Sequence, residues 1–412
     1  MTDAAVDQQP LGYQLSRYRW VVLAAFMFIN LTIQILWITY APINSTAATF
    51  YGVSELKIGL LAMVFMIAFI PLSIPVSWSI DTYGFHRTVG FGAALMGVCG
   101  VLRGVAGSSY TFVLLSTIGI AIAQPFLLNA WTKVPAQWFG LKERATAVGL
   151  VTLSNLVGTA LGMVLTPALI KSFSIPTVQV IYGAVAAFSA VVFIVVAREK
   201  PATPPCPPGQ EVRALALEGL KHALRVKEFW FYLCVVFIGF GIFNGITTWV
   251  ENIITPRHFT SGDAGTVGAL MLGGGIIGAV VISALSDRQR KRQRYLFLGF
   301  IAAIPWMFGL TYATKSTAWL LYISAFFLGF FLVSAMPVGM QYAAEVTQPT
   351  PEGTSNGLIQ LFGQASVVFV YIMEGLKTKS GAFTPALLLA VGLMVVSVGL
   401  IFGMKDAPRL TS

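Results

Sequence analysis

Long apolar runs separated by short polar segments make up almost the whole chain. Twelve of these runs approach or exceed about 20 residues, the length that an α-helix needs to cross a bilayer. The pattern predicts six helices, a gap and six more helices, over residues 20–44, 55–80, 87–107, 109–132, 143–170, 176–197, 228–255, 263–286, 294–313, 317–343, 353–376 and 381–404. We therefore expect an all-α membrane protein whose 12 transmembrane helices form two pseudo-symmetric six-helix bundles.

The polar segments divide the chain into five parts. We expect a cytoplasmic tail over 1–19, a bundle over 20–197, a cytoplasmic linker over 198–227, a second bundle over 228–404 and a cytoplasmic tail over 405–412. The linker begins with a proline-rich stretch that cannot be helical throughout. It continues as a basic amphipathic stretch, which predicts either a helix lying on the membrane surface or a solvated linker helix.

An acidic residue followed by basic residues recurs at corresponding places in the two halves. Asp81 ends the second helix and precedes Arg87, and Asp287 ends the eighth helix and precedes a basic run, 206 residues later. A carboxylate at such a junction can pair with Arg87 or Arg144 and can cap a neighbouring helix. We expect these four residues to control the conformation of the protein, with a role in fixing topology as the alternative.

Composition and charge agree with a membrane protein. Apolar residues make up 56% of the chain and charged residues only 10%, against about 25% in soluble domains. The net charge of +10 does not indicate nucleic-acid binding, because the Lys and Arg residues lie in short loops. If the N-terminus is cytoplasmic, 19 of the 26 basic residues face the cytoplasm. An excess of Lys and Arg in cytoplasmic loops is typical of membrane proteins. We expect a monomer in the cell (inner) membrane with both termini cytoplasmic.

Polar side chains within the predicted spans indicate where a solute binds. Such groups are costly in lipid and usually face a cavity or a partner helix. They gather on the first, fourth and fifth helices of each half, which is typical of a transporter cavity between two halves. The predicted substrate-binding residues are Gln34, Trp37, Tyr40, Gln124, Asn244, Gln360 and Gln364.

Charged residues within the spans restrict the solute. We expect Arg103 and Lys133, near helix ends, to extend towards the membrane surface. The lack of a buried cation then argues against anions, whereas amides and aromatic rings suit a neutral or cationic solute. Glu251 is the predicted proton-coupling residue, with a position at the outer end of its helix as the alternative reading.

Other functions are less consistent with the sequence. The three histidines, His86, His222 and His258, lie outside the spans, so we expect neither an enzyme nor a cofactor or metal. A secondary transporter or facilitator remains the main hypothesis, with a small-molecule substrate and the bilayer as its partners. Its alternatives are a proton-coupled antiporter or exporter and a non-transporting membrane receptor.

Several longer strings resemble a known family. The two six-helix halves and their acidic-to-basic junctions resemble the major facilitator superfamily. Within it, Trp37-Ile-Thr-Tyr40, Ser77-Trp-Ser-Ile-Asp-Thr82, Pro337-Val-Gly-Met340 and Gly363-Gln-Ala365 are similar to the feline leukaemia virus subgroup C receptor family. The resemblance implies the major facilitator fold, alternating access, and transport of choline, ethanolamine or, in earlier reports, haem.

The resemblance also implies roles for individual positions. Trp37 matches the family's cage tryptophan, and Gln124 and Gln364 match its glutamines in the fourth and eleventh helices. Asn244 stands where the choline transporters have tyrosine, so one aromatic wall of a quaternary-ammonium cage is missing. Glu251 stands where the family has an amide. The resemblance therefore implies a small amine, a vitamin-like compound or another polar heterocycle, and leaves choline open.

Overall fold

The computed structural model describes residues 16–201, 221–289, 291–348, 350 and 352–405. Within this part of the chain, 12 helices are long and apolar enough to cross a membrane. The predicted fold class is therefore confirmed. The predictions for the two tails and for the amphipathic stretch of the linker lie almost entirely outside the described residues.

The first half of the molecule, residues 19–196, contains the first six spans. Its elements are α1 (Arg19–Ile38), η1 (Ala41–Ile43), α2 (Asn44–Tyr51), α3 (Glu55–Tyr83), α4 (Phe85–Val105), α5 (Tyr110–Leu128), α6 (Lys133–Trp138), α7 (Leu141–Leu169) and α8 (Ile175–Val196).

The second half, residues 227–402, contains the other six. Its elements are α10 (Lys227–Thr248), α11 (Val250–Ile254), η2 (Thr255–Arg257), α12 (Ser261–Gln289), α13 (Arg292–Tyr312), η3 (Lys315–Thr317), α14 (Ala318–Val346), α15 (Glu352–Ala365), α16 (Val367–Gly375) and α17 (Thr384–Phe402).

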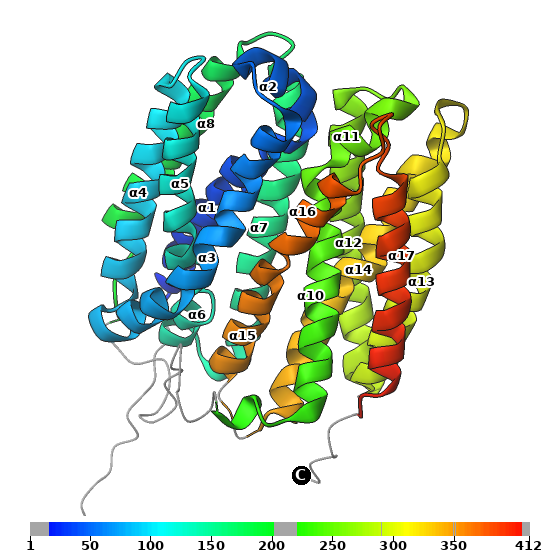
Figure 1. The fold of residues 1–412 in the computed structure, drawn as a ribbon. Helices are drawn as coiled ribbons and strands as arrows, with labels where there is room; N and C mark the ends of the chain where they lie inside the picture. The colour runs from blue at the N-terminus through cyan, green and yellow to red at the C-terminus, as the bar shows by residue number, and fades with distance from the viewer. Residues whose placement is uncertain (1–15, 202–220, 290, 349, 351, 406–412) are drawn as a thin grey trace, which may run out of the picture.

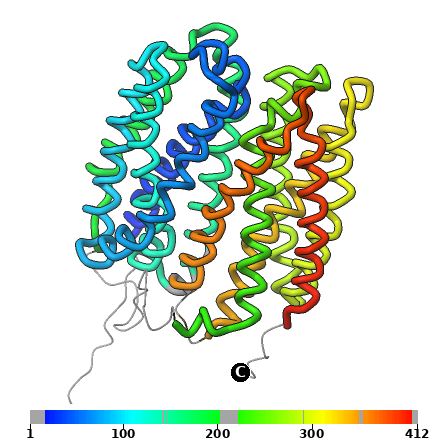
Figure 2. The backbone as a smooth tube through the Cα atoms, in the orientation of Figure 1, coloured from blue at the N-terminus to red at the C-terminus, as the bar shows by residue number. Residues whose placement is uncertain are grey.

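The two halves lie side by side and repeat the same packing (Figures 1 and 2). In the first half α3 packs on α5 and α4 packs on α8, and in the second half α12 packs on α14 and α13 packs on α17. Across the interface, α7 contacts α12 and α3 contacts α15 and α16. The interface therefore brings together helices that are distant in the sequence.

Three predicted helices are interrupted. The run 20–44 ends its α-helix at Ile38 and continues as η1 and α2, with Pro42 in the first turn of η1. Proline lacks the N–H that would continue an α-helical ladder. The runs 228–255 and 353–376 are interrupted at Trp249 and Ser366. These interruptions lie in helices that face the other half.

The bundle has two different ends. We call the end that carries Ser45, Glu251 and Lys377 the Ser45 end, and the end that carries Arg19 and Lys405 the termini end. Figure 1 shows α2 and α11 at the Ser45 end, opposite the C-terminus.

Candidate functional site

A cavity of about 150 Å³ lies between the two halves. Most of its first-half wall comes from α1, α5 and α7, and most of its second-half wall comes from α10, α14 and α15. None of the described residues that line it is Asp, Glu, Lys, Arg or His. The walls therefore offer amides, hydroxyls and aromatic rings for binding.

The first-half wall carries three amides, Gln34, Gln124 and Asn155. Asn155 donates its amide N–H to the carbonyl oxygen of Val151 at 2.9 Å, so its amide oxygen is left as an acceptor. The amide oxygens of all three residues accept no hydrogen bond from the described residues. Asn155 lies in a predicted span, and its polarity is the signal that a sequence reading can use.

Two tryptophans on the same wall are held by their N–H groups. The indole N–H of Trp37 donates to the carbonyl of Ala62 at 3.2 Å, and that of Trp131 donates to the side chain of Asn30 at 2.8 Å. Because these donors are already used, the two indoles offer the cavity only carbon and ring surface. The prediction did not include Trp131, which follows the end of α5.

The second-half wall is largely aromatic and aliphatic. It contains Tyr232, Phe240, Phe243 and Phe300, together with Val, Leu and Met side chains. Three amides are added by Asn244 on α10 and by Gln360 and Gln364 on α15. Aromatic side chains on α10 escape a reading based on polar residues, because in a span they look like ordinary apolar positions.

Six of the seven predicted substrate-binding residues line the cavity: Gln34, Trp37, Gln124, Asn244, Gln360 and Gln364. Tyr40 is not among the lining residues. Its hydroxyl lies 3.1 Å from that of Tyr51, and its ring lies under the guanidinium of Arg103. The helix ends at Ile38, so the helical face that carries Gln34 and Trp37 does not extend to Tyr40.

Arg103 is where the prediction about basic residues was wrong. Its side chain is only 1% exposed and donates to the carbonyl of Leu36 at 2.9 Å, near the C-terminal end of α1. A cation is favoured there by the unpaired carbonyls of the helix end. The first half thus holds a buried cation, but this residue does not line the cavity.

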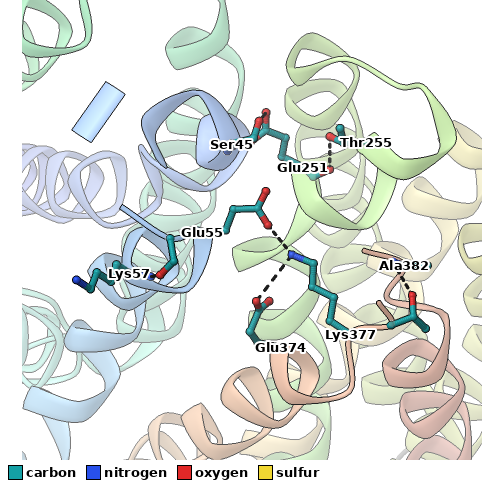
Figure 3. Close-up of polar contacts among 10 residues, drawn as sticks. Ser45, Glu55, Lys57, Glu251, Thr255, Glu374, Lys377 and Ala382 are labelled. Carbon is teal, nitrogen blue, oxygen red and sulfur yellow. Dashed lines mark hydrogen bonds and ion pairs between the residues drawn. The ribbon is translucent and has the colours of Figure 1, made fainter. Parts of the chain in front are cut away.

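Glu251 joins the two halves at the Ser45 end (Figure 3). Its carboxylate accepts from the backbone N–H of Ser45 at 2.8 Å and from the Ser45 hydroxyl at 2.7 Å, and also from the hydroxyl of Ser261 at 2.7 Å. Glu251 is 2% exposed, and burial raises its pKa; the nearby Glu55 carboxylate also raises the pKa, whereas the hydrogen bonds from Ser45 and Ser261 lower it. It lies beyond the span that ends at Thr248 and outside the cavity lining.

An ion pair and close packing add to this contact. Lys377, in the second half, pairs with Glu55 of α3 and lies 3.8 Å from Glu374. Trp249 is fully buried, and its ring packs on Gly59 of α3 so closely that a Cβ there would lie 2.3 Å from a ring carbon. The Ser45 end is therefore closed between the halves by charge, hydrogen bonds and packing.

At the termini end, the ion pairs between residues that the structure describes join residues of the same half. Asp81 pairs with Lys133 at 2.9 Å in this structure, and the side chain of Arg87 is exposed. Asp287 pairs with Arg292, which also binds Glu345 at 3.2 Å.

A carboxylate that is distant in the sequence caps α4 at the junction where Asp81 was expected to act. Glu199 accepts from the backbone N–H groups of Phe85 and His86, at 3.1 and 2.7 Å, and so caps α4 in place of Asp81. Arg144 donates to the main-chain carbonyls of Phe139 and Ala136. Glu199 and Glu345 were not predicted, because each is distant in the sequence from the helix end or the arginine that it binds.

The chain is similar to several known proteins. The family model of the Major Facilitator Superfamily matches residues 22–371. The choline/ethanolamine transporter FLVCR2 of Rattus norvegicus is 27% identical over 88% of this chain and 70% of its own length. The choline/ethanolamine transporter FLVCR1 of Felis catus is 28% identical over 93% of this chain and 73% of its own. Solute carrier family 49 member A3 of Danio rerio is 28% identical over 89% and 80%.

A solved structure has the same fold. A bacterial homologue of the human lysosomal transporter Spinster, in an inward-facing and unoccupied conformation, superposes with a TM-score of 0.74. It is 18% identical, and the match covers 94% of this chain and 97% of that one.

Proposed function

The chain belongs to the Major Facilitator Superfamily and is a membrane transporter, and we propose that its substrate is a small organic amine that binds in the central cavity. The observation that carries this proposal is the lining of the cavity, which combines amides with Trp37, Trp131 and several phenylalanines and holds no charged side chain among the described residues. Aromatic faces attract cations, and amides bind polar groups without fixing a charge. The names of the FLVCR relatives, choline and ethanolamine transporters, support the same class.

The proposed substrate contacts are Gln34, Trp37, Gln124, Asn244, Gln360 and Gln364. Trp37 is well placed to contact a bound substrate, because the hydrogen bond from its indole N–H to the carbonyl of Ala62 fixes the ring at the cavity wall. Tyr40 is left out, since it packs with Tyr51 and Arg103. No catalytic step, cofactor or metal is part of this proposal.

The transport cycle we propose is alternating access between two six-helix bundles, 20–197 and 228–404. We take the protein to be a monomer in the cell membrane with both termini in the cytoplasm. The closed Ser45 end is then the outer end. The cavity includes Leu128 and Trp131 after the middle of α5 and Tyr232 near the start of α10, which extends it towards the termini end. Opening the cavity to the outside then requires the contacts of Glu251 and Lys377 to break.

Asp81, Arg144 and Asp287 support this cycle as residues that stiffen each half, because the partners described here for each lie in its own half. Arg87 is exposed and is not part of this role. Glu251 is proposed to make the cycle sensitive to pH, since its protonation changes a contact that joins the halves.

Transport by purified protein in liposomes tests the proposal. We expect uptake of radiolabelled ethanolamine or choline above that of empty liposomes, and a loss of at least about tenfold in Trp37→Ala, which removes a fixed ring from the cavity. Trp319→Ala is the matched control, because Trp319 is 62% exposed on the outer surface of α14. Folded protein that is inserted in the liposomes and takes up neither amine would contradict the proposed function. Equal uptake by Trp37→Ala and the wild type would contradict it as well.

A further inference from the structure

Three hydrogen-bond acceptors on one wall of the cavity receive no hydrogen bond from the described residues. They are the amide oxygens of Gln34 on α1, Gln124 on α5 and Asn155 on α7. Gln124 and Asn155 are each only 4% exposed, so bulk water does not reach them freely. All three lie on the first-half wall.

The orientation of Asn155 is fixed by the protein itself. Its amide N–H donates to the carbonyl of Val151, four residues earlier in α7, so that the oxygen, not the nitrogen, is the atom without a partner in the described part of the chain. A buried acceptor without a donor carries a desolvation cost that a bound partner removes. Since the neighbouring Trp37 and Trp131 already use their N–H groups on Ala62 and Asn30, these two indoles do not supply the missing donors.

The opposite wall supplies a different interaction. Tyr232, Phe240, Phe243 and Phe300 line the second half of the cavity, and ring faces attract a positive charge without needing an N–H group. A ligand that spans the cavity therefore meets acceptors on one side and rings on the other. A positively charged group that also donates hydrogen bonds is complementary to both walls.

We propose that the cavity selects a primary ammonium over a quaternary ammonium, because only the former carries N–H donors for the oxygens of Gln34, Gln124 and Asn155. This inference rests on the proposed function, since it concerns the same cavity and the same class of small amine. A primary ammonium has three N–H donors and a quaternary ammonium has none. The positive charge is the same in both, so the difference isolates hydrogen bonding from charge.

A methylation series measures the selectivity directly. Ethanolamine, N-methylethanolamine, N,N-dimethylethanolamine and choline keep one charge and one hydroxyl while N–H donors are replaced by methyl groups. Binding to the purified full-length protein is measured by isothermal calorimetry, together with competition against transported ethanolamine. We expect affinity to fall along the series, by about tenfold for each acceptor left without a donor.

A pair of variants ties the effect to the wall. Asn155→Leu removes one acceptor at nearly constant size, and we expect it to reduce the ratio of ethanolamine to choline affinity by about tenfold. Gln179→Leu is the control: Gln179 is a fully buried amide of the same half whose oxygen also receives no hydrogen bond from a described residue, but it does not line the cavity. We expect that ratio to stay unchanged in the control.

The outcomes separate the two proposals. Binding that is equal along the series, or tightest for choline, overturns the selectivity while leaving the amine transporter intact. If none of the four amines binds or moves, the proposed function itself fails. A flat series in the wild type decides the question even if Asn155→Leu does not fold, and an equal loss of the ratio in Gln179→Leu would show that the wall is not the cause.

Discussion

The polar contacts that the structure describes differ between the two ends of the interface between the halves. At the Ser45 end, Glu251 binds Ser45 and Lys377 binds Glu55, so contacts cross from one half to the other. At the termini end, among the residues the structure describes, the ion pairs of Asp81 and Arg292 stay within a half.

This difference indicates what can move. A contact that crosses the interface must break when the halves separate, whereas a contact within a half moves with it as a unit. On the proposed transport cycle, we therefore expect the contacts at the Ser45 end to set the equilibrium between transport conformations. Variants at the Ser45 end should shift a conformational equilibrium.

A distance measurement reports this equilibrium. Spin labels at Thr46→Cys and Pro256→Cys lie on exposed positions of α2 and η2, one in each half at the Ser45 end. They are introduced after Cys99, Cys206 and Cys234 are replaced. The distribution of distances by electron–electron double resonance then gives the fraction closed.

The largest effect is expected for Trp249→Ala. Removing a buried aromatic side chain costs about 3–5 kcal/mol in other proteins, and Trp249 also donates to the carbonyl of Val370 at 2.9 Å. We expect a lower melting temperature and a shift of the label distances to longer values. Trp78→Ala is the control, since Trp78 is 58% exposed. A closed distance distribution in Trp249→Ala would show that packing on Gly59 does not hold this end.

Glu251→Ala should have the next largest effect. It removes the two hydrogen bonds from Ser45 that cross between the halves, and at about 1.5 kcal/mol each their loss gives a shift of about 3 kcal/mol towards the open end. Glu251→Gln keeps acceptor capacity and should retain closure. If Glu251→Ala stays closed, the carboxylate is not what joins the halves.

The same residue predicts a pH dependence with a definite sign. Burial raises the pKa of Glu251 in the closed end above its ordinary value of 4.5, and in the open end the carboxyl is expected to return to that value. Closure therefore gains a contribution that is complete below pH 4.5 and is lost as the pH rises through the raised pKa. Label distances across a pH titration should show opening as the pH rises, and Glu251→Gln should abolish it. A titration unchanged in Glu251→Gln would remove Glu251 as the pH-sensing group.

Gly265→Ala tests packing at the same end with a smaller change. A Cβ at Gly265 of α12 would lie 2.6 Å from the backbone oxygen of Met163 on α7, so the two halves must move apart. Overpacking of this kind costs about 1–3 kcal/mol. Gly273→Ala on the same helix has no atom within 4 Å of its added Cβ and serves as the control. Equal label distances in the two variants would show that α7 and α12 tolerate the added methyl group.

The smallest effect is expected for Lys377→Met. The Lys377 and Glu55 side chains are 22% and 36% exposed, and solvent-exposed ion pairs contribute about 0–1 kcal/mol. We expect the ratio of closed to open molecules to change by less than about fivefold, and by less in high salt. A shift as large as that of Glu251→Ala would mean that the exposed pair, and not the buried carboxylate, dominates closure.

The sequence alone predicted the spans and six of the residues that line the cavity, most of them amides. Each apolar run must form a helix in lipid because its backbone hydrogen bonds have to be made internally, and this requirement is local. Polar residues within those runs had to face something other than lipid, which is why Gln34, Gln124 and Gln364 could be predicted from their positions alone.

Only the tertiary structure decided where side chains beyond helix breaks point and what opposes them. Tyr40 follows the end of α1 and turns to Tyr51, Arg103 is buried against a helix end, and Glu251 meets a backbone N–H some 206 positions away in the chain. These contacts depend on how the two halves approach one another. Hydrophobic periodicity sets the helices but carries no information about the distance or angle between them.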